Sequence, residues 1–183
     1  GKELNLYGTP GNDLGVYMAG GHINVFGNGQ DAVGNTMGGG RIVIHGSTGD
    51  ALGYAMLNGE IYVKGDAGFR CGIHMKEYKE QKPVIVIGGK AGSFLGEYMA
   101  GGKIILLGLG YHDVEKVGSY CATGMHGGVI YVKGSIKETN LSHEVKMETC
   151  TSKDKGEIAL FVQNYCNFFG CDYEEIMRDD FIK

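Results

Sequence analysis

Short stretches in which apolar and polar residues alternate recur along the chain, and each is followed by glycine. A period of two is typical of a β-strand with one buried face. No copy carries ten consecutive residues of helical pattern, so the sequence predicts strands joined by glycine-containing turns. The apolar pairs that mark the strands are Ile23/Val25, Ile42/Ile44, Ile61/Val63, Val84/Val86, Ile104/Leu106 and Ile130/Val132.

The strands belong to a longer unit that recurs at a step of 19 residues and ends in Met-x-Gly-Gly-x-Ile-x-Val-x-Gly. Copies occupy residues 18–27, 37–46, 56–65, 99–108 and 125–134, and a degenerate copy occupies 75–88. The methionines and glycines that define the unit are Gly15, Met18, Gly20, Gly21, Gly34, Met37, Gly39, Gly40, Gly53, Met56, Gly59, Gly96, Met99, Gly101, Gly102, Gly127 and Gly128. Short strands and glycine turns at a fixed period predict stacked coils.

We therefore predict an all-β fold, a parallel β-helix of about seven coils over residues 1–140. From residue 155 the glycine pattern stops, and apolar residues follow the spacing of an amphipathic helix. These residues are Ile158, Phe161, Val162, Tyr165 and Phe169. Gly170 would end this helix, and Asp172 with Glu175 resembles a capping box that opens a second one. We expect residues 141–183 to form an extension with one or two helices that pack on the β-helix.

One group of strand positions is apolar where a polar residue is expected. We assign Ile85, Ile87, Ile105 and Leu107 to the outward face, whereas the outward positions of earlier copies are mixed. A strand that is apolar on both faces has to be covered. The C-terminal helix is the simpler cover, and a partner protein is the alternative. These four residues therefore form a candidate partner surface.

The amino-acid composition excludes several classes of protein. The chain has 17 Lys and Arg against 21 Asp and Glu, which argues against nucleic-acid binding because such proteins carry a basic face. Glycine accounts for 34 of 183 residues but proline for only 2, which excludes a collagen and a Pro-rich disordered chain. Five Cys without paired spacing make a disulfide framework unexpected. No apolar run is long enough to span a membrane and no secretory signal is visible, so we expect a cytoplasmic protein.

The residues that could carry chemistry are scattered. None of the six histidines shares a row with another in the aligned copies: His22, His45, His74, His112, His126 and His143. Cys71 and Cys121 fall in an inward apolar row, which is a poor place for a thiolate. We therefore expect no catalytic, cofactor-binding or metal-binding residue.

Asp31 and Asp50 occupy equivalent places in successive copies. Stacked carboxylates could bind a cation or serve a stand-alone hydrolase that acts in a groove along the helix. Asp at a turn more often accepts hydrogen bonds from backbone N–H groups. Both interpretations stay open at this stage.

The glycine pattern around Met-x-Gly-Gly resembles the GXGXG domain at the C-terminus of the glutamate synthase large (alpha) subunit. The likeness is most specific at residues 92–108 (GSFLGEYMAGGKIILLG), and the tail at residues 157–183 resembles the helices of that domain. The resemblance implies a right-handed, single-stranded parallel β-helix without catalytic residues. It implies a structural role, holding a glutamine amidotransferase part that releases ammonia beside an FMN part that makes glutamate from 2-oxoglutarate.

The same resemblance implies that FMN and an iron–sulfur cluster reside on partner domains or subunits, because this chain has no flavin-barrel or cluster motif. The chain would be an excised domain or a subunit of a split enzyme, and it could also form a homo-oligomer. A related fold occurs in the C subunit of formylmethanofuran dehydrogenase. That family is the alternative, and its implied role is again structural.

Overall fold

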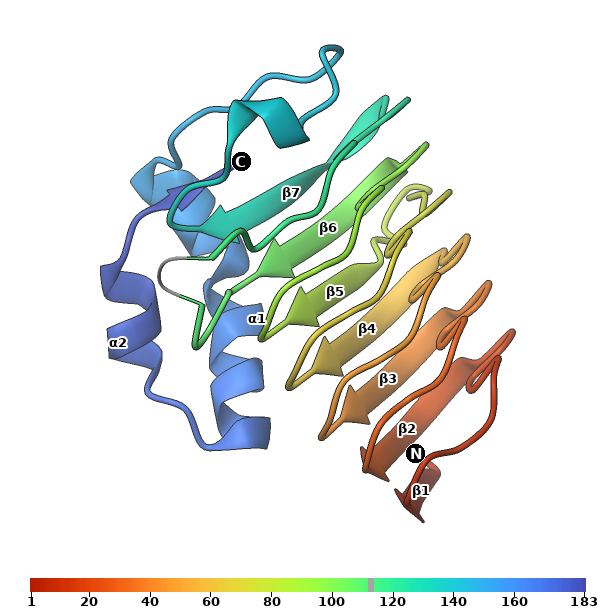
Figure 1. The fold of residues 1–183 in the computed structure, drawn as a ribbon. Helices are drawn as coiled ribbons and strands as arrows, with labels where there is room; N and C mark the ends of the chain where they lie inside the picture. The colour runs from red at the N-terminus through yellow and green to blue at the C-terminus, as the bar shows by residue number, and fades with distance from the viewer. Residues whose placement is uncertain (112–113) are drawn as a thin grey trace.

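The computed structural model describes residues 1–111 and 114–183, and within them the strands stack in chain order into one sheet (Figure 1). Each strand is parallel to its neighbours except the last, which runs antiparallel to the one before it. The strands are β1 (Glu3–Tyr7), β2 (Ala19–Phe26), β3 (Gly38–Ile44), β4 (Asn58–Val63), β5 (Val84–Ile87), β6 (Ala100–Leu106), β7 (Gly127–Lys133) and β8 (Phe181–Ile182). The helices are η1 (Glu138–Asn140), α1 (Ser152–Phe169) and α2 (Tyr173–Arg178).

The predicted fold class is wrong. The structure is an open, mostly parallel sheet of eight strands with α-helices beside it, an α/β-like arrangement, and not a closed all-β parallel β-helix. Between strands the chain returns through turns. Successive returns are joined by backbone hydrogen bonds, such as the one that the N–H of Ala32 donates to the carbonyl of Asp50 at 2.8 Å, but among the described residues they form isolated bridges such as Ala67↔Ala91 and no strands. No second sheet therefore closes the structure, and its description as a parallel β-helix repeat protein is not supported.

The strand register places equivalent residues side by side. Ile23 lies opposite Ile42, and Ile42 lies opposite Ile61. The larger core lies between this face of the sheet and the turn-rich returns. Val33, Leu52 and Leu95 on the returns are fully buried in it, as are Met37 and Met56. Close packing of one residue type above another explains why the sequence keeps these positions apolar in every copy.

Glycine is required where the returns approach the strands. Gly34 has φ +73°, and a Cβ on it would lie 2.3 Å from the Cδ1 atom of Ile61. At Gly40, with φ +91°, a Cβ would lie 2.7 Å from the carbonyl oxygen of Gly21. Both positions therefore need a residue without a side chain, for conformational and for steric reasons.

The opposite face of the sheet packs against α1, which forms a second core (Figure 1). Ile158, Val162 and Tyr165 of α1 are buried against it. The Tyr165 hydroxyl donates a hydrogen bond to the backbone carbonyl of Lys64 at 3.0 Å. The predicted helix stop is confirmed, because Gly170 adopts a left-handed conformation with φ +71°. None of the helices in the described residues is long and apolar enough to cross a membrane.

The candidate partner surface needs two corrections. Ile85 and Ile87 lie on the inner face with the larger core, and the outward residues of β5 are Val84 and Val86. The aligned pattern placed Val84 in the row of Ile61, but Ile85 lies opposite Ile61, so the repeat resumes one residue later than the pattern assumed. A shift of one residue moves each side chain to the other face. Ile105 and Leu107 do face outward, but they are fully buried in the α1 core. These side chains therefore present no free surface.

Candidate functional site

Aromatic side chains, most of them exposed, gather with one arginine on the returns, along the edge where each turn leads back towards a strand. We call this group the turn-edge surface. It consists of Tyr54, Phe69, Arg70, His74, Phe94, Tyr98 and Tyr120. Aromatic residues and arginine are the residue types enriched at the centres of protein–protein interfaces.

Two stacks make up the turn-edge surface. In one, the Arg70 guanidinium lies 5.0 Å from the ring centroid of Phe94, which is stacked on Tyr120 at 5.1 Å. In the other, His74 is stacked on Tyr98 at 5.3 Å. Arg70 also forms an ion pair of 3.1 Å from its Nε atom to Oε2 of Glu97, a buried residue that precedes Tyr98 in the chain. The surface is thus held by contacts among its own side chains.

The backbone under these aromatic residues is in an unfavourable region. Phe94, Tyr98 and Tyr120 have φ values of 62°, 52° and 61°, a conformation that L-residues with large side chains avoid. The equivalent residues in an earlier return are Ala51 and Ala55, also with positive φ. The fold therefore sets the conformation, and the sequence places bulky rings where glycine or asparagine would be less strained. Strain of this kind tends to occur at functional sites.

A second exposed aromatic group lies on the outer face of the sheet, beyond the part that α1 covers. Tyr7 is stacked on Phe26 at 5.0 Å, and Phe26 is stacked on His45 at 4.5 Å. The edge of Phe169, at the end of α1, meets His45 at 5.3 Å. Burial and the nearby charge of Lys64 lower the pKa of His45, which favours the neutral ring. We call this group the outer aromatic column, and it extends the α1 core onto β1 and β2.

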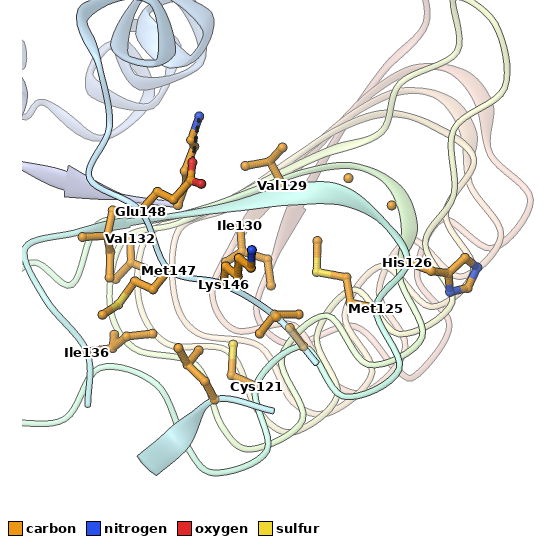
Figure 2. A pocket seen from close by; sticks show the side chains of 17 residues that line it. Cys121, Met125, His126, Val129, Ile130, Val132, Ile136, Lys146, Met147 and Glu148 are labelled. Atoms are coloured by element: carbon orange, nitrogen blue, oxygen red, sulfur yellow. Dashed lines mark ion pairs between the residues drawn. The ribbon is translucent and has the colours of Figure 1, made fainter. Parts of the chain in front are cut away.

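An apolar cavity of about 450 Å³ lies beside β7, where the stack of strands ends (Figure 2). Met125 and Ile130 line it from β7 and the preceding turn, and Ile136 and Val145 line it from the segment that crosses the end. Lys146 lies on the crossing segment and also lines the cavity. The cavity is large enough for several side chains, and its lining is mostly apolar, with charged or polar side chains from His126, Lys146, Glu148 and Lys183.

Asp31 and Asp50 each bind backbone. Oδ1 of Asp31 accepts a hydrogen bond from the N–H of Asp50 at 2.8 Å, and Oδ1 of Asp50 accepts one from the N–H of Phe69 at 2.8 Å. Asn12 makes the same contact to the N–H of Asp31. These are the hydrogen bonds expected of turn residues, and they give the two carboxylates a structural role.

The predicted histidines are not brought together as a metal site. Among the described residues, no three or more His, Cys, Asp or Glu side chains form a cluster that could hold a metal ion. His74 lies in the turn-edge surface and His45 in the outer aromatic column. His126 borders the cavity, with Nδ1 3.0 Å from the carbonyl oxygen of Gly124. His112 lies outside the described residues.

The five cysteines are free thiols. Burial raises the pKa of Cys71, and burial raises the pKa of Cys121 to about 12 and that of Cys166 to about 11. A thiol with a raised pKa is a poor nucleophile near neutral pH. These three residues therefore behave as small apolar side chains of the two cores.

Sequence reasoning missed the turn-edge surface. Phe94 and Tyr120 stand in a row that holds Asp13, Ala32 and Ala51 in the earlier copies, so their large side chains were visible in the sequence, whereas the row of Tyr98 already holds Tyr17. Their exposure depends on the shape of the return, which the glycine pattern alone does not specify.

Comparison with known proteins shows which family the chain belongs to. The GXGXG motif family matches residues 2–183, so the chain belongs to the GXGXG family. The uncharacterized protein MJ1350 of Methanocaldococcus jannaschii is 49% identical over 169 residues, which are 91% of this chain and 65% of that protein. The chain thus spans just under two thirds of the length of the curated relative it matches.

A solved structure shares the fold. It is the formyltransferase/hydrolase complex (FhcABCD) from Methylorubrum extorquens, in complex with methylofuran. The TM-score is 0.57 at 20% sequence identity, and the match covers 97% of this chain and 71% of the other. The neighbour is therefore a subunit of a multi-subunit assembly, and the likeness at this identity is one of fold.

Proposed function

We propose that this chain is a non-catalytic structural part of glutamate synthase, which holds the glutamine amidotransferase part and the FMN-binding, glutamate-forming part in one assembly. FMN and the iron–sulfur cluster belong to those partners, and this chain binds no cofactor of its own. Membership of the GXGXG family and the sequence resemblance at residues 92–108 support the proposal. The fold likeness to a subunit of a multi-subunit complex is consistent with such a role.

The observation that carries the proposal is the turn-edge surface. Tyr98 and Tyr120 hold exposed rings and Phe94 a half-buried one on left-handed backbone, where glycine would be less strained. Selection for stability alone does not explain them, but selection for a contact with a partner does. We propose that a catalytic partner packs on this surface, with the stacked rings and Arg70 as its anchors.

The experiment is a reconstitution with the amidotransferase and FMN polypeptides of the same organism. All three chains are co-expressed, and glutamate formation from glutamine and 2-oxoglutarate is measured with and without this chain. We expect the three to co-purify, coupled glutamate formation to need this chain, and this chain alone to have neither activity. Full coupled activity without the chain, or failure to bind either partner, would contradict the proposal.

A second candidate is a structural subunit of an assembly of the formylmethanofuran dehydrogenase type. The fold match to the FhcABCD complex, over 97% of this chain, favours it. The same affinity purification from the native organism separates the two candidates. Recovery of formyl-transferring or formyl-oxidising subunits, in place of amidotransferase and FMN subunits, would select the second.

A further inference from the structure

The stack of strands ends before its last layer is complete. After β7 the chain begins another return, in which Leu141 forms a bridge with Cys121 and the N–H of Ser142 donates to the carbonyl of Cys121 at 2.9 Å. Ile136 and Val145 extend the inner core by one further layer. The chain then turns away, and the N–H of Glu148 donates to the carbonyl of Lys183. A strand equivalent to β7 is therefore absent from this layer in the described residues.

One edge of β7 is left largely unpaired as a result. β8 is antiparallel to β7 and pairs only with Val132 and Lys133. No described strand or bridge lies against the outer edge of residues 127–131. An unpaired strand edge is a ready template for another extended chain.

The ladder pattern indicates which backbone groups point to the open side. The N–H of Lys103 donates to Pro83 and that of Leu107 to Ile87, so alternate residues of β6 bond to β5. Val129 lies opposite Lys103 and Tyr131 opposite Ile105, so both bond to β6 in the same way. In a parallel ladder the intervening residue bonds to the other side. The N–H and C=O of Ile130 therefore face the open edge.

The cavity of about 450 Å³ lies directly beside this edge (Figure 2). The apolar side of the cavity continues the inner rows of the sheet. Ile130 lies opposite Ile104 in the strand register, and Met125 is equivalent to Met99 in the aligned copies. The next inner side chains of an added parallel strand would fall in this space. A row of unpaired backbone groups beside an apolar cavity fits a peptide strand better than a small molecule, which would leave the edge unsatisfied.

We propose that residues 127–131 and the adjoining cavity form a strand-binding site. It takes an extended segment of another polypeptide, which adds to β7 as a parallel strand and places two alternate aliphatic side chains over Ile130 and Met125. The assignment of that polypeptide to a partner subunit rests on the proposed function, but strand binding itself does not depend on it.

A different polypeptide suits the site better than a second copy of this chain. β1 of a second copy has the required alternation at Leu4 and Leu6, and Leu4 is half-exposed. Docking it on β7 would however be a head-to-tail contact, which generates open filaments unless the rotation closes a ring. A segment from another protein ends the stack after one addition.

The test uses a peptide with the sequence of β7 as a substitute for the missing next strand. A fluorescein-labelled peptide with the sequence of residues 127–134 (GGVIYVKG) is titrated with the full chain, and fluorescence anisotropy is measured. We expect saturable binding. N-methylation of the peptide at the positions equivalent to Val129 and Tyr131, whose N–H groups would face β7, should weaken binding by about tenfold or more. N-methylation at the positions equivalent to Ile130 and Val132 should leave the affinity within about twofold.

A matched pair of protein variants tests the other side of the contact. Ile130→Asp places a charge in the cavity and should abolish peptide binding. Leu160→Asp makes the same change at an exposed position of α1 and should not affect it. If Ile130→Asp does not fold, as judged by circular dichroism, the two N-methylated peptides decide the question alone.

Three results would overturn the proposal. These are no saturable binding up to about 1 mM peptide, equal loss with both N-methylated peptides, or self-association of the wild-type chain that Ile130→Asp abolishes. The last result would assign the site to a second copy. Because the titration needs only this chain and a peptide, it can succeed where the reconstitution of glutamate synthase fails, so the two proposals are tested separately.

Discussion

The two faces of the sheet are built on different principles. On the inner face each strand has an apolar residue of similar shape to the one beside it on the next strand, as in Ile42 beside Ile61. These residues form continuous apolar rows across the strands. On the outer face each strand differs, with Val43 beside Tyr62 beside Val86, and α1 covers the result. The inner face therefore specifies the fold through a pattern, whereas the outer face depends on individual contacts between residues far apart in sequence.

The same contrast holds between the inner core and the turn-edge surface. Core residues of the returns, such as Leu52 and Leu95, lie in rows whose members are all apolar. The less buried positions beside them change from Ala51 to Arg70 to Phe94. The regular interior leaves the exposed turn positions free to vary, and we expect function to be found there.

The largest expected effect is on the inner face. Leu52→Ala leaves a cavity between two rows and should lower the free energy of unfolding by about 2–5 kcal/mol. Leu160→Ala, on the exposed side of α1, should change it by no more than about 0.5 kcal/mol. Urea denaturation followed by circular dichroism measures both. Equal effects from the two substitutions would refute the assignment of the core.

A smaller effect is expected on the outer face. Tyr165→Phe keeps the packing but removes the hydrogen bond to the carbonyl of Lys64 and leaves that acceptor without its partner. We expect a loss of about 1–2 kcal/mol in the free energy of unfolding. The same urea experiment measures it. A neutral result would mean that α1 is held by apolar contacts alone.

On the turn-edge surface we expect stability and binding to separate. Tyr120→Gly relieves the left-handed backbone but loses the stack on Phe94, so the free energy of unfolding should stay within about 1 kcal/mol of wild type. Affinity for the catalytic partner should fall by about tenfold or more, as measured by isothermal titration calorimetry. Tyr7→Ala is the control in the outer aromatic column. If it weakens binding and Tyr120→Gly does not, the interface lies on the sheet.

The smallest effect concerns pH. Hydrogen bonds from Lys183 and from Thr151 at the start of α1 hold the pKa of Asp154 well below its ordinary 3.8. The folded pKa is lowered, so this contribution is complete above pH 3.8 and is lost as the pH falls towards the folded value. Asp154 raises the pKa of Lys183 in turn, so that contribution is lost only as the pH rises above 10.5. Asp154→Asn should flatten the acid limb of thermal stability measured against pH.

The sequence predicted the strand positions and most inner rows because burial on one face forces a period of two, which needs no knowledge of the rest of the fold. It also predicted the helix over Ile158–Phe169 and its end at Gly170, because those signals are local. The face of β5 was wrong because a one-residue shift in the insertion before Val84 is invisible in an alternating run of apolar residues. The sequence also did not predict whether the returns would pair as strands, because neither Ala51 nor Phe94 is a residue type that indicates left-handed backbone.

The most direct measurement compares wild-type chain with Phe94→Gly/Tyr120→Gly in co-purification with the amidotransferase and FMN polypeptides, alongside the thermal midpoint of each free chain. We predict that wild type elutes in one complex with both polypeptides. The double variant should unfold at a midpoint close to that of wild type but lose at least one partner. A folded double variant that assembles as wild type does would contradict the claim that this chain works through the rings on its turns.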